Sequence, residues 1–449
     1  MADANRIILI NAPLAGERQL PIELAYLSTK LTADGFLVEG VDCADGHCGI
    51  ERRIAASKNL LGILVHMRSP GVMSYPPDWE GTRGLISKIK SVSPAPIGLS
   101  GQFPTLHAPR CLKECPVDFV VCGNHYSAVP RAFHLLRNGT RPPRIIMDTL
   151  NGVKQYHGTV TSFGIPDARL FDFTKYMPTF FSPRANSFPL LTSIGCAYRC
   201  FYCFSSRMWG HDFYCKPPGD VVREIRHLSE EFGIRHFVIE DDLFNYDRAR
   251  LIRICRRITK ENLNITWECI NGLRVDHLDE ELIGEMARAG CIHIALGLET
   301  FNDRVLRQLG RQFDRDHLVV ILGACHNLNV RTTGYFIVNL PGNRGTDALQ
   351  DIMASLRLKL TFAHYSLLQH YPATSGKGIS ENAVGMRTRM LVLLGYLLFY
   401  CRISRMRVIA SILLRNPSRT RKIVERMERI LISRPPPRRP RDRTWTSSS

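Results

Sequence analysis

Three cysteines near the middle of the chain form the pattern most able to do chemistry. Cys196, Cys200 and Cys203 follow the spacing Cys-x3-Cys-x2-Cys, in a run that begins at Gly195. Thiolates are the usual ligands of iron–sulfur clusters, and a [4Fe–4S] cluster takes four of them when it is fully held by protein. Three cysteines therefore leave one iron without a protein ligand. Such an iron can bind and act on a small molecule.

A structural zinc site is the alternative explanation of these cysteines. Zinc knuckles use four ligands in two matched pairs. The nearest further candidate, His211, stands alone eight residues after Cys203. The sequence therefore favours a cluster with an open iron, and a zinc site is kept as the alternative.

Short apolar runs alternate with amphipathic segments around and after the cysteines. Strands are expected at 189–194, 234–240, 265–269, 292–298, 332–339 and 364–369, with intervening helices such as 220–232 and 279–289. Six strand–helix units suit a partial (β/α)6 barrel. In parallel barrels, functional groups project from the carboxyl ends of the strands.

The predicted strand ends carry a set of polar and aromatic side chains. In chain order they are Glu240, Asp241 and Asp242, then Glu268, Asn271 and Arg274, then Glu299, and finally Phe336 and Asn339. A helix cap or a solvated turn would also account for the acidic trio. Their order behind the cysteines is more informative than any one of them.

The cysteine run, with Tyr202 just before its last cysteine, and the strand-end residues together resemble the radical S-adenosylmethionine (SAM) enzymes over about residues 188–372. The resemblance implies that the open iron chelates the amino and carboxylate groups of SAM. It also implies that a reduced cluster cleaves SAM to a 5′-deoxyadenosyl radical, which removes hydrogen from a substrate.

The same resemblance suggests roles for individual residues. Glu240, Asp241 and Asp242 would bind the SAM ammonium, and Glu299 would contact the ribose or methionine portion. The segment with Phe336 and Asn339 would line the adenine, Tyr202 would lie at the cofactor, and Glu268 and Asn271 would meet SAM or substrate. Asp241 and Cys269 are the catalytic candidates, with Cys269 as a hydrogen-atom donor. A buried cysteine acting as a small hydrophobic residue is the alternative for Cys269.

The first 140 residues also alternate between strand and helix. Strands are expected at 6–11, 36–41, 60–66, 96–99 and 118–122, with helices at 21–33 and 129–136. This pattern predicts a parallel, doubly wound sheet. With Gly101-Gln-Phe-Pro-Thr105 and Val120-Val-Cys-Gly123, its layout resembles the cobalamin-binding-type domain that precedes many radical SAM barrels.

Several residues depart from the cobalamin pattern. The loop at 11–16 has no histidine where some cobalamin domains supply a lower ligand to cobalt. The run Asp45-Gly-His47-Cys-Gly49 is close to the pattern Asp-x-His-x-x-Gly but is one residue shorter. It follows the second predicted strand instead of the first and is expected to be a surface loop. Ser100-Gly101-Gln102-Phe103 stands where relatives often have Gly-Gly-Pro-His. The sequence therefore leaves cobalamin possible and undecided.

The expected organisation is α/β with a helical end. Residues 1–140 form the cobalamin-binding-type domain, 141–187 a proline-rich linker, 188–375 the radical SAM barrel, 376–433 a C-terminal helical extension, and 434–449 a disordered basic tail. The apolar run Met390–Cys401 has twelve residues, well short of the ~20 that a membrane span needs. It is expected to be a buried helix, and no membrane span is predicted.

Composition places the chain among cytoplasmic globular proteins. It is 45% apolar and 22% charged, without a secretory signal at its start. Fourteen cysteines are then expected to be free thiols in a reducing compartment. Sixteen Lys or Arg after residue 383, against Glu425, Glu428 and Asp442, hold +13 of the +18 net charge. A solvated basic tail is preferred over nucleic-acid binding.

Three functions follow from the sequence. The preferred one resembles the radical SAM diol dehydratases of aminoglycoside biosynthesis: dehydration or deoxygenation of an amino-sugar diol in antibiotic biosynthesis. The alternative is a cobalamin-dependent radical SAM C-methyltransferase. A remote alternative is a non-catalytic metal-binding protein whose tail contacts nucleic acid. The expected partners are a polar sugar or aminoglycoside intermediate and a flavodoxin-type electron donor.

Overall fold

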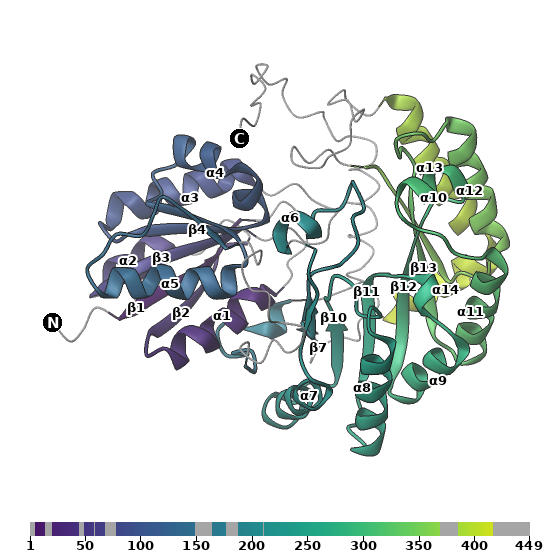
Figure 1. Cartoon of the computed structure of the whole chain (residues 1–449), viewed down its shortest axis with the longest axis horizontal. Coiled ribbons are helices and arrows are strands. Elements are labelled where there is room, and N and C mark those ends of the chain that lie inside the picture. Colours follow the sequence, from purple (N-terminus) through teal and green to yellow (C-terminus); the bar gives the residue numbers. More distant parts are fainter. Residues whose placement is uncertain are drawn as a thin grey trace.

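Two six-stranded parallel sheets, each flanked by helices, form the protein (Figure 1). The computed structural model describes residues 5–13, 20–44, 49–57, 59–67, 78–148, 164–176, 187–209, 211–368 and 385–415. The loop at 45–48 and the tail at 434–449 lie outside the described residues. The α/β class predicted from the sequence is confirmed.

The N-terminal sheet has the strand order β2-β1-β3-β4-β5-β6. Its strands are β1 (Arg6–Asn11), β2 (Leu37–Asp42), β3 (Leu60–Met67), β4 (Ile97–Gly101), β5 (Phe119–Gly123) and β6 (Ile145–Asp148). Its helices are α1 (Ile22–Ala33), α2 (Ile50–Ala56), α3 (Trp79–Val92), α4 (Gln102–Glu114) and α5 (His125–Arg137). The order reverses between β1 and β3, and ligands of such sheets bind at the carboxyl ends of the strands near that point.

Helices cover both faces of this sheet because its strands are apolar on both sides. Ile7 and Leu9 of β1 pack with residues of α1 and α5, whereas Ile8 and Ile10 pack with residues of α2, α3 and α4. Continuous burial of this kind is typical of parallel strands. The predicted doubly wound sheet is confirmed, and its five predicted strands lie within two residues of β1 to β5.

Strand β6 corrects the predicted linker. It lies inside 141–187, a segment expected to lack regular structure, and it pairs with β5 from Val120↔Ile145 to Gly123↔Asp148. The strand has only four residues beside two prolines, Pro142 and Pro143, so its periodicity is too short to see. A 3-10 helix, η1 (Phe173–Lys175), also falls in this segment.

The second sheet curves into an open barrel in the order β14-β13-β12-β11-β10-β7. The strands are β7 (Ser187–Leu190), β10 (His236–Ile239), β11 (Thr266–Leu273), β12 (Cys291–Glu299), β13 (Arg331–Ile337) and β14 (Phe362–Ser366). The helices are α7 (Pro218–Phe232), α8 (Arg248–Lys260), α9 (Glu280–Arg288), α10 (Asp303–Gln308), α11 (Arg315–Asn327) and α12 (Gly345–Arg357), with the 3-10 turn η2 (Val275–His277). Figure 1 shows these helices along the outer side of the curved sheet. The predicted partial (β/α)6 barrel is confirmed.

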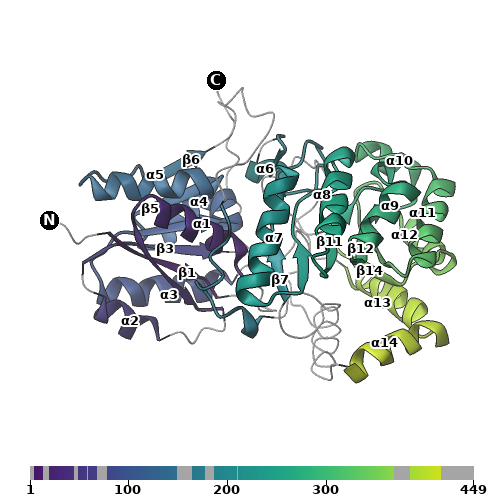
Figure 2. The same cartoon turned by 90° about the horizontal axis from the view of Figure 1, so that it is seen from below.

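The C-terminal extension begins with two helices, α13 (Met386–Tyr400) and α14 (Ile403–Arg415). Helix α13 packs on α12 and β14, where Val392, Gly395 and Phe399 are buried. The predicted buried helix at 390–401 is only half correct, because Met390 on the other side is 52% exposed. Helix α14 lies at the edge of the molecule (Figure 2). Within the described residues, no helix has the length and apolarity needed to cross a bilayer.

Most cysteines are free thiols, as predicted. Twelve cysteines among the described residues carry free thiols. Cys43, just after β2, is the exception because it is disulfide-bonded.

A buried polar cluster joins the N-terminal sheet to the barrel. The Tyr26 hydroxyl of α1 donates to the Glu224 carboxylate of α7, and the Lys216 ammonium donates to both Tyr26 (3.0 Å) and Glu224 (2.5 Å). The Lys216 and Glu224 side chains are 4% and 2% exposed. Burial lowers the pKa of Lys216 and raises that of Glu224, so each charge depends on the other.

Removing the carboxylate of this cluster should destabilise the protein. Glu224→Ala leaves the Lys216 ammonium buried without its counter-ion, so the free energy of unfolding should fall by about 3–5 kcal/mol. Thermal and urea unfolding measure the loss. The control Glu230→Ala changes an exposed glutamate on the same helix and should leave stability within about 0.5 kcal/mol of wild type. Equal stability of the two variants would contradict a structural role for the cluster.

Candidate active site

The three cysteines lie on a loop that leaves and returns at the carboxyl end of β7. The loop is closed by a small antiparallel ladder between β8 (Ser193–Ile194) and β9 (Tyr214–Cys215), with Ile194 opposite Tyr214. Its start needs a glycine: Gly195 has φ +85°, and a Cβ there would lie 2.2 Å from the Asp212 carbonyl oxygen. The loop also carries the short helix α6 (Ser205–Trp209). Residues 195–213 are called the cysteine loop below.

Two carboxylates that follow β10, buried Asp241 and partly exposed Asp242, hold the start of the cysteine loop. Asp241 accepts hydrogen bonds from the backbone N–H of Thr192 (2.6 Å), the Thr192 hydroxyl (2.6 Å) and the Ser193 hydroxyl. Asp242 accepts from the Gly195 N–H at 2.9 Å. Burial raises the pKa of both groups, that of Asp242 to about 6.

These bonds correct the role predicted for Asp241. Both of its oxygens accept bonds from the segment before the cysteines, and the residue is 1% exposed. These bonds position the cysteine loop and occupy both oxygens, which does not fit the catalytic role expected of Asp241. Of the acidic trio, Glu240 is better suited than Asp241 to contact a cofactor, because its side chain is partly exposed beside the cysteine loop.

The cysteines themselves sit at the boundary between barrel and solvent. Cys200 is buried, while Cys196 and Cys203 are partly exposed. A turn holds the last two, since the Cys203 N–H donates to the Cys200 carbonyl at 3.0 Å. Burial raises the pKa of Cys196 to about 11, so a metal must displace its proton on binding. In the described part of the chain, no three His, Cys, Asp or Glu side chains are placed so that they could together hold one metal ion.

Arg311 is a site residue that the sequence analysis missed. Its Nη1 lies 3.3 Å from the Glu299 carboxylate and donates to the Gly297 carbonyl at 2.7 Å. A Cβ on Gly297 would lie 2.8 Å from that nitrogen, so the glycine leaves room for the guanidinium. Arg311 follows Gly310 in a loop between helices. Neither periodicity nor a strand end marks its position.

Arg311 and Glu299 connect the end of β12 to the cysteine loop. Glu299 has φ +62°, an uncommon value outside glycine. The Tyr202 side chain is buried beside them, and its burial together with the Glu299 charge raises its pKa. Arg311 is also close enough to Cys200 for the thiol to influence its pKa. The structure therefore brings Tyr202, Glu299 and the cysteines together, as predicted.

Two predicted cofactor residues instead tie strand ends to each other. The Asn271 amide donates to the carbonyls of Glu240 (3.0 Å) and Asp241 (2.9 Å). The Asn339 carbonyl oxygen accepts from the Leu368 N–H at 2.5 Å. Both side chains are partly buried at the carboxyl edge of the barrel. Their bonds fix the strand ends that surround the cysteine loop.

Glu268 does not lie with the cysteines. It is fully buried inside the barrel, where His236 and His293 contact its two oxygens at 3.1 Å each. Burial alone would raise the pKa of Glu268, but these two histidines outweigh it and lower the pKa below its ordinary value. Glu268 is paired with Val238, two residues before Glu240. The prediction that it meets SAM is therefore not supported.

Cys269 and Phe336 also point away from the expected site. Cys269 is 1% exposed and has Cys255 of α8 among its neighbours, so its thiol faces the helix layer. Phe336 is 1% exposed and stacks on Tyr365. Side chains alternate between the two faces of a strand, and the next residue, Ile337, is the one that packs with Cys200 and Tyr202. Cys269 is therefore not placed to donate hydrogen inside the barrel.

The N-terminal sheet meets the cysteine loop at the carboxyl ends of β3, β4 and β5. His66, one residue before the end of β3, bonds Ser100 of β4 at 2.9 Å. His125, just after β5, lies 5.1 Å from His66 and 5.9 Å from Trp209 of α6, measured between ring centres. His125 is 1% exposed, and neither of its ring nitrogens has a hydrogen-bond partner among the residues that the structure describes. No histidine was predicted here, because the expected ligand position follows the first strand.

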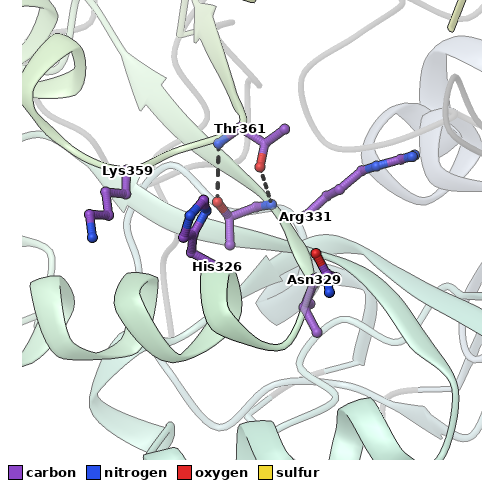
Figure 3. A pocket seen from close by; sticks show the side chains of 7 residues that line it. His326, Asn329, Arg331, Lys359 and Thr361 are labelled. Carbon is purple, nitrogen blue, oxygen red and sulfur yellow. Dashed lines mark hydrogen bonds between the residues drawn. The ribbon is translucent and has the colours of Figure 1, made fainter. Parts of the chain in front are cut away.

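A polar hollow lies at the opposite end of the barrel from the cysteines. It measures about 250 Å³ and is lined by residues at the amino ends of β13 and β14, including Arg331, Lys359 and Thr361. Thr332 and Thr361 are joined by two reciprocal hydrogen bonds in its wall, which Figure 3 marks as dashed lines at Thr361. Active sites of parallel barrels lie at the carboxyl ends, so this hollow is separate from the chemistry.

Residues 190–352 match the sequence profile of the radical SAM superfamily. This range begins in β7, contains all three cysteines and ends in α12. The chain carries a radical SAM domain. The match confirms the resemblance inferred from the cysteine spacing.

Curated relatives of the radical SAM domain include methyltransferases. An uncharacterized methyltransferase of Pyrococcus horikoshii is 23% identical over 298 residues, which cover 62% of this chain and 61% of that protein. Cytidylyl-2-hydroxyethylphosphonate methyltransferase of Streptomyces wedmorensis is 28% identical over 170 residues, 37% of this chain and 31% of that enzyme. The chain thus spans less than two thirds of the length of each relative.

Solved structures share the fold of both sheets. The radical SAM methyltransferase TsrM from Kitasatospora setae matches with a TM-score of 0.68 and 19% identity, covering 82% of this chain and 74% of TsrM. The cobalamin-dependent radical enzyme OxsB, with aqua-cobalamin and SAM bound, matches with a TM-score of 0.62 and 16% identity, covering 82% of this chain and 54% of OxsB. Each match covers 82% of the chain, so the similarity of fold extends over most of its length.

Loss of the Arg311 guanidinium should destabilise the end of β12. Arg311→Met leaves the Glu299 carboxylate nearly buried without a counter-ion, so the free energy of unfolding should fall by about 1–3 kcal/mol. Chemical denaturation measures the change. Arg307→Met, at an exposed position one turn earlier, is the control and should be neutral. If both variants match wild type, the ion pair does not organise this strand end.

Proposed function

We propose that this protein is a radical SAM enzyme in which Cys196, Cys200 and Cys203 hold a [4Fe–4S] cluster with one open iron. The observation that carries the proposal is the placement of three cysteines, and no fourth, on a loop at the carboxyl end of a parallel barrel. When bound and reduced, the cluster supplies the electron that cleaves SAM and starts radical chemistry.

The chemistry of the donor set fits the cluster. The three sulfurs lie on one loop, and the guanidinium of Arg311 lies near Cys200, where it can offset part of the negative charge of a thiolate-bound cluster. Apolar contacts from Ile337 and Leu340 cover the inner side of the loop. This cover limits water, which would otherwise react with radicals.

The remaining residues of the site orient SAM. Glu240 and Glu299 offer carboxylates to the cationic and hydroxyl-bearing parts of SAM, and Arg311 fixes the Glu299 side chain. Asp241, Asp242 and Asn271 hold the backbone around them. In this arrangement few protein acids or bases are needed, because the side chains mainly bind, orient and exclude water.

Methyl transfer is the reaction that the relatives favour. Two curated relatives and TsrM are methyltransferases, and both TsrM and OxsB have been solved with cobalamin bound. None of these proteins is described as a diol dehydratase, so the preferred sequence-based function lacks support. We therefore infer a cobalamin-dependent methyltransferase acting on a small molecule.

One observation in the N-terminal domain fits a corrinoid. Cobalamin-type domains hold the group at the carboxyl ends of a doubly wound sheet, where this chain has His125 with two ring nitrogens that lack a partner within the described part of the chain. An imidazole nitrogen is a common metal ligand. Burial and the nearby His66 lower the pKa of His125, which keeps its ring neutral and able to bind a metal. His125 would thus take the role that the loop at 11–16 cannot fill.

Substrate, electron donor and location stay predictions. A polar sugar or aminoglycoside intermediate, a flavodoxin-type donor and a cytoplasmic location were inferred from sequence and resemblance alone. Neither the fold nor the relatives bear on them.

Removing one of the three cysteines should prevent both cluster binding and cleavage of SAM. Anaerobically prepared Cys200→Ala should lose most of its iron and sulfide and form no 5′-deoxyadenosine from SAM and a reductant, because two thiolates do not hold the cluster. Metal analysis and chromatography of the products check both. Cys401→Ala, at an exposed cysteine after α13, should behave as wild type. A Cys200 variant with a full cluster would refute the assignment, and wild type lacking iron would favour the zinc alternative.

Replacing His125 should separate corrinoid binding from folding. His125→Phe keeps the ring volume and loses no hydrogen bond, so the melting temperature should hold while hydroxocobalamin binds about 10- to 100-fold more weakly. A visible-spectrum titration measures the affinity, and electron paramagnetic resonance of the Co(II) form reports nitrogen coupling. His107→Phe, on α4 in the same domain, is the control. Unchanged binding would exclude His125 as the ligand, and no binding by wild type would exclude the cobalamin-dependent reaction.

A further inference from the structure

Helix α13 is apolar on two opposite sides, and only one of them is packed. Val392, Gly395 and Phe399 face β14 and α12. On the other side Met386, Met390, Leu394 and Leu397 are 69%, 52%, 37% and 45% exposed. Their spacing of four, four and three residues places them in one stripe along the helix. A helix that is apolar all round is normally buried on every side, so this stripe lacks a cover among the described residues.

The stripe continues onto α14. Ile403 and Met406, at the start of that helix, are 72% and 54% exposed. Figure 2 shows α13 and α14 together at the lower right edge of the molecule, with α14 below α13. The six residues Met386, Met390, Leu394, Leu397, Ile403 and Met406 are called the α13–α14 surface below. Contiguous exposed apolar surface of this kind marks an interaction site.

The charge around the α13–α14 surface has one sign. Residues 385–415 contain six arginines and no aspartate or glutamate. Arg387, Arg402 and Arg407 are exposed beside the apolar stripe. The sequence after residue 415 adds ten further Lys or Arg against three acidic residues. A second copy of the same surface would bring like charges together, so the charge favours an anionic partner.

The exposed side chains of α13 lack the aromatic residues that anchor many protein interfaces. Such interfaces are enriched in Tyr, Trp and Phe as well as in Met and Arg, and the aromatic side chains of α13 turn inward. Tyr396 bonds His364, Tyr400 bonds the Ala363 carbonyl, and Phe399 is 1% exposed. The exposed stripe holds only flexible aliphatic and thioether side chains. Helices with such a stripe beside arginines lie in the interface of anionic bilayers.

We propose that the α13–α14 surface docks the protein peripherally on an anionic lipid bilayer. The aliphatic stripe enters the headgroup boundary, and the flanking arginines contact the lipid phosphates. This inference is independent of the reaction proposed for the barrel, because the main contacts of α13 are with α12, β14 and α14.

The test uses the full chain and vesicles of defined composition. Flotation should recover the protein with phosphatidylcholine vesicles that contain phosphatidylglycerol and much less with pure phosphatidylcholine. The double variant Met390→Gln/Leu394→Gln should bind the anionic vesicles about 10-fold more weakly. Both side chains are already exposed, so the melting temperature and the iron content should not change.

A matched control separates the stripe from general surface effects. Val319→Gln/Val320→Gln replaces two exposed apolar residues of α11, 55% and 45% exposed, and should bind vesicles as wild type does. Equal binding by wild type and the α13 double variant would overturn the proposal, because the basic residues alone would then explain attraction. Absence of anionic-vesicle binding would also overturn it. So would a dimer in solution that the α13 variant converts to monomers, because a second copy would then cover the surface.

Discussion

The site depends on hydrogen bonds between two neighbouring carboxylates, one of them fully buried, and the segment before the cysteines. Asp241 and Asp242 follow β10, and they hold Thr192, Ser193 and Gly195, which lead from β7 into the cysteine loop. A loop with three metal ligands and no cluster would otherwise be free to adopt many conformations, at a cost in entropy when it binds. These hydrogen-bonded carboxylates preorganise it before any cofactor arrives. This explains why acidic residues follow the neighbouring strand of the barrel.

The N-terminal sheet and the barrel act as one unit through the same region. The Tyr26 hydroxyl of α1 reaches the Lys216–Glu224 pair of the barrel, and Lys216 directly follows β9, which closes the cysteine loop. On the other side Trp209 of α6 packs near His125. The carboxyl edge of the first sheet therefore faces the cysteine loop across packed side chains. An arrangement of this kind allows a group held by one sheet to reach chemistry started in the other.

The barrel keeps its polar groups in layers with different tasks. Near the amino ends of the strands, His236, Glu268 and His293 satisfy one another and fill the interior. At the carboxyl edge, Glu299 and Arg311 pair beside the cysteines. A satisfied buried network makes a core rigid and specific, whereas the partly exposed edge can admit a ligand. Carboxylates paired with cationic or imidazole groups thus serve structure near the amino ends of the strands and are available for binding at the carboxyl ends. The position along the strand determines which role a residue has.

The sequence by itself determined the local features. Apolar periodicity predicted eleven of the twelve strands of the two large sheets, all but β6, and the Cys-x3-Cys-x2-Cys spacing predicted the radical SAM domain. It also grouped Tyr202 and Glu299 with the cysteines. It failed for Glu268, Cys269 and Phe336, because proximity to a strand end says neither which layer nor which face a side chain occupies. Arg311 and His125 reach the site from loops, and β6 is too short to show a period. Only the tertiary structure decided these, because such contacts depend on strand register and on how the two sheets pack together.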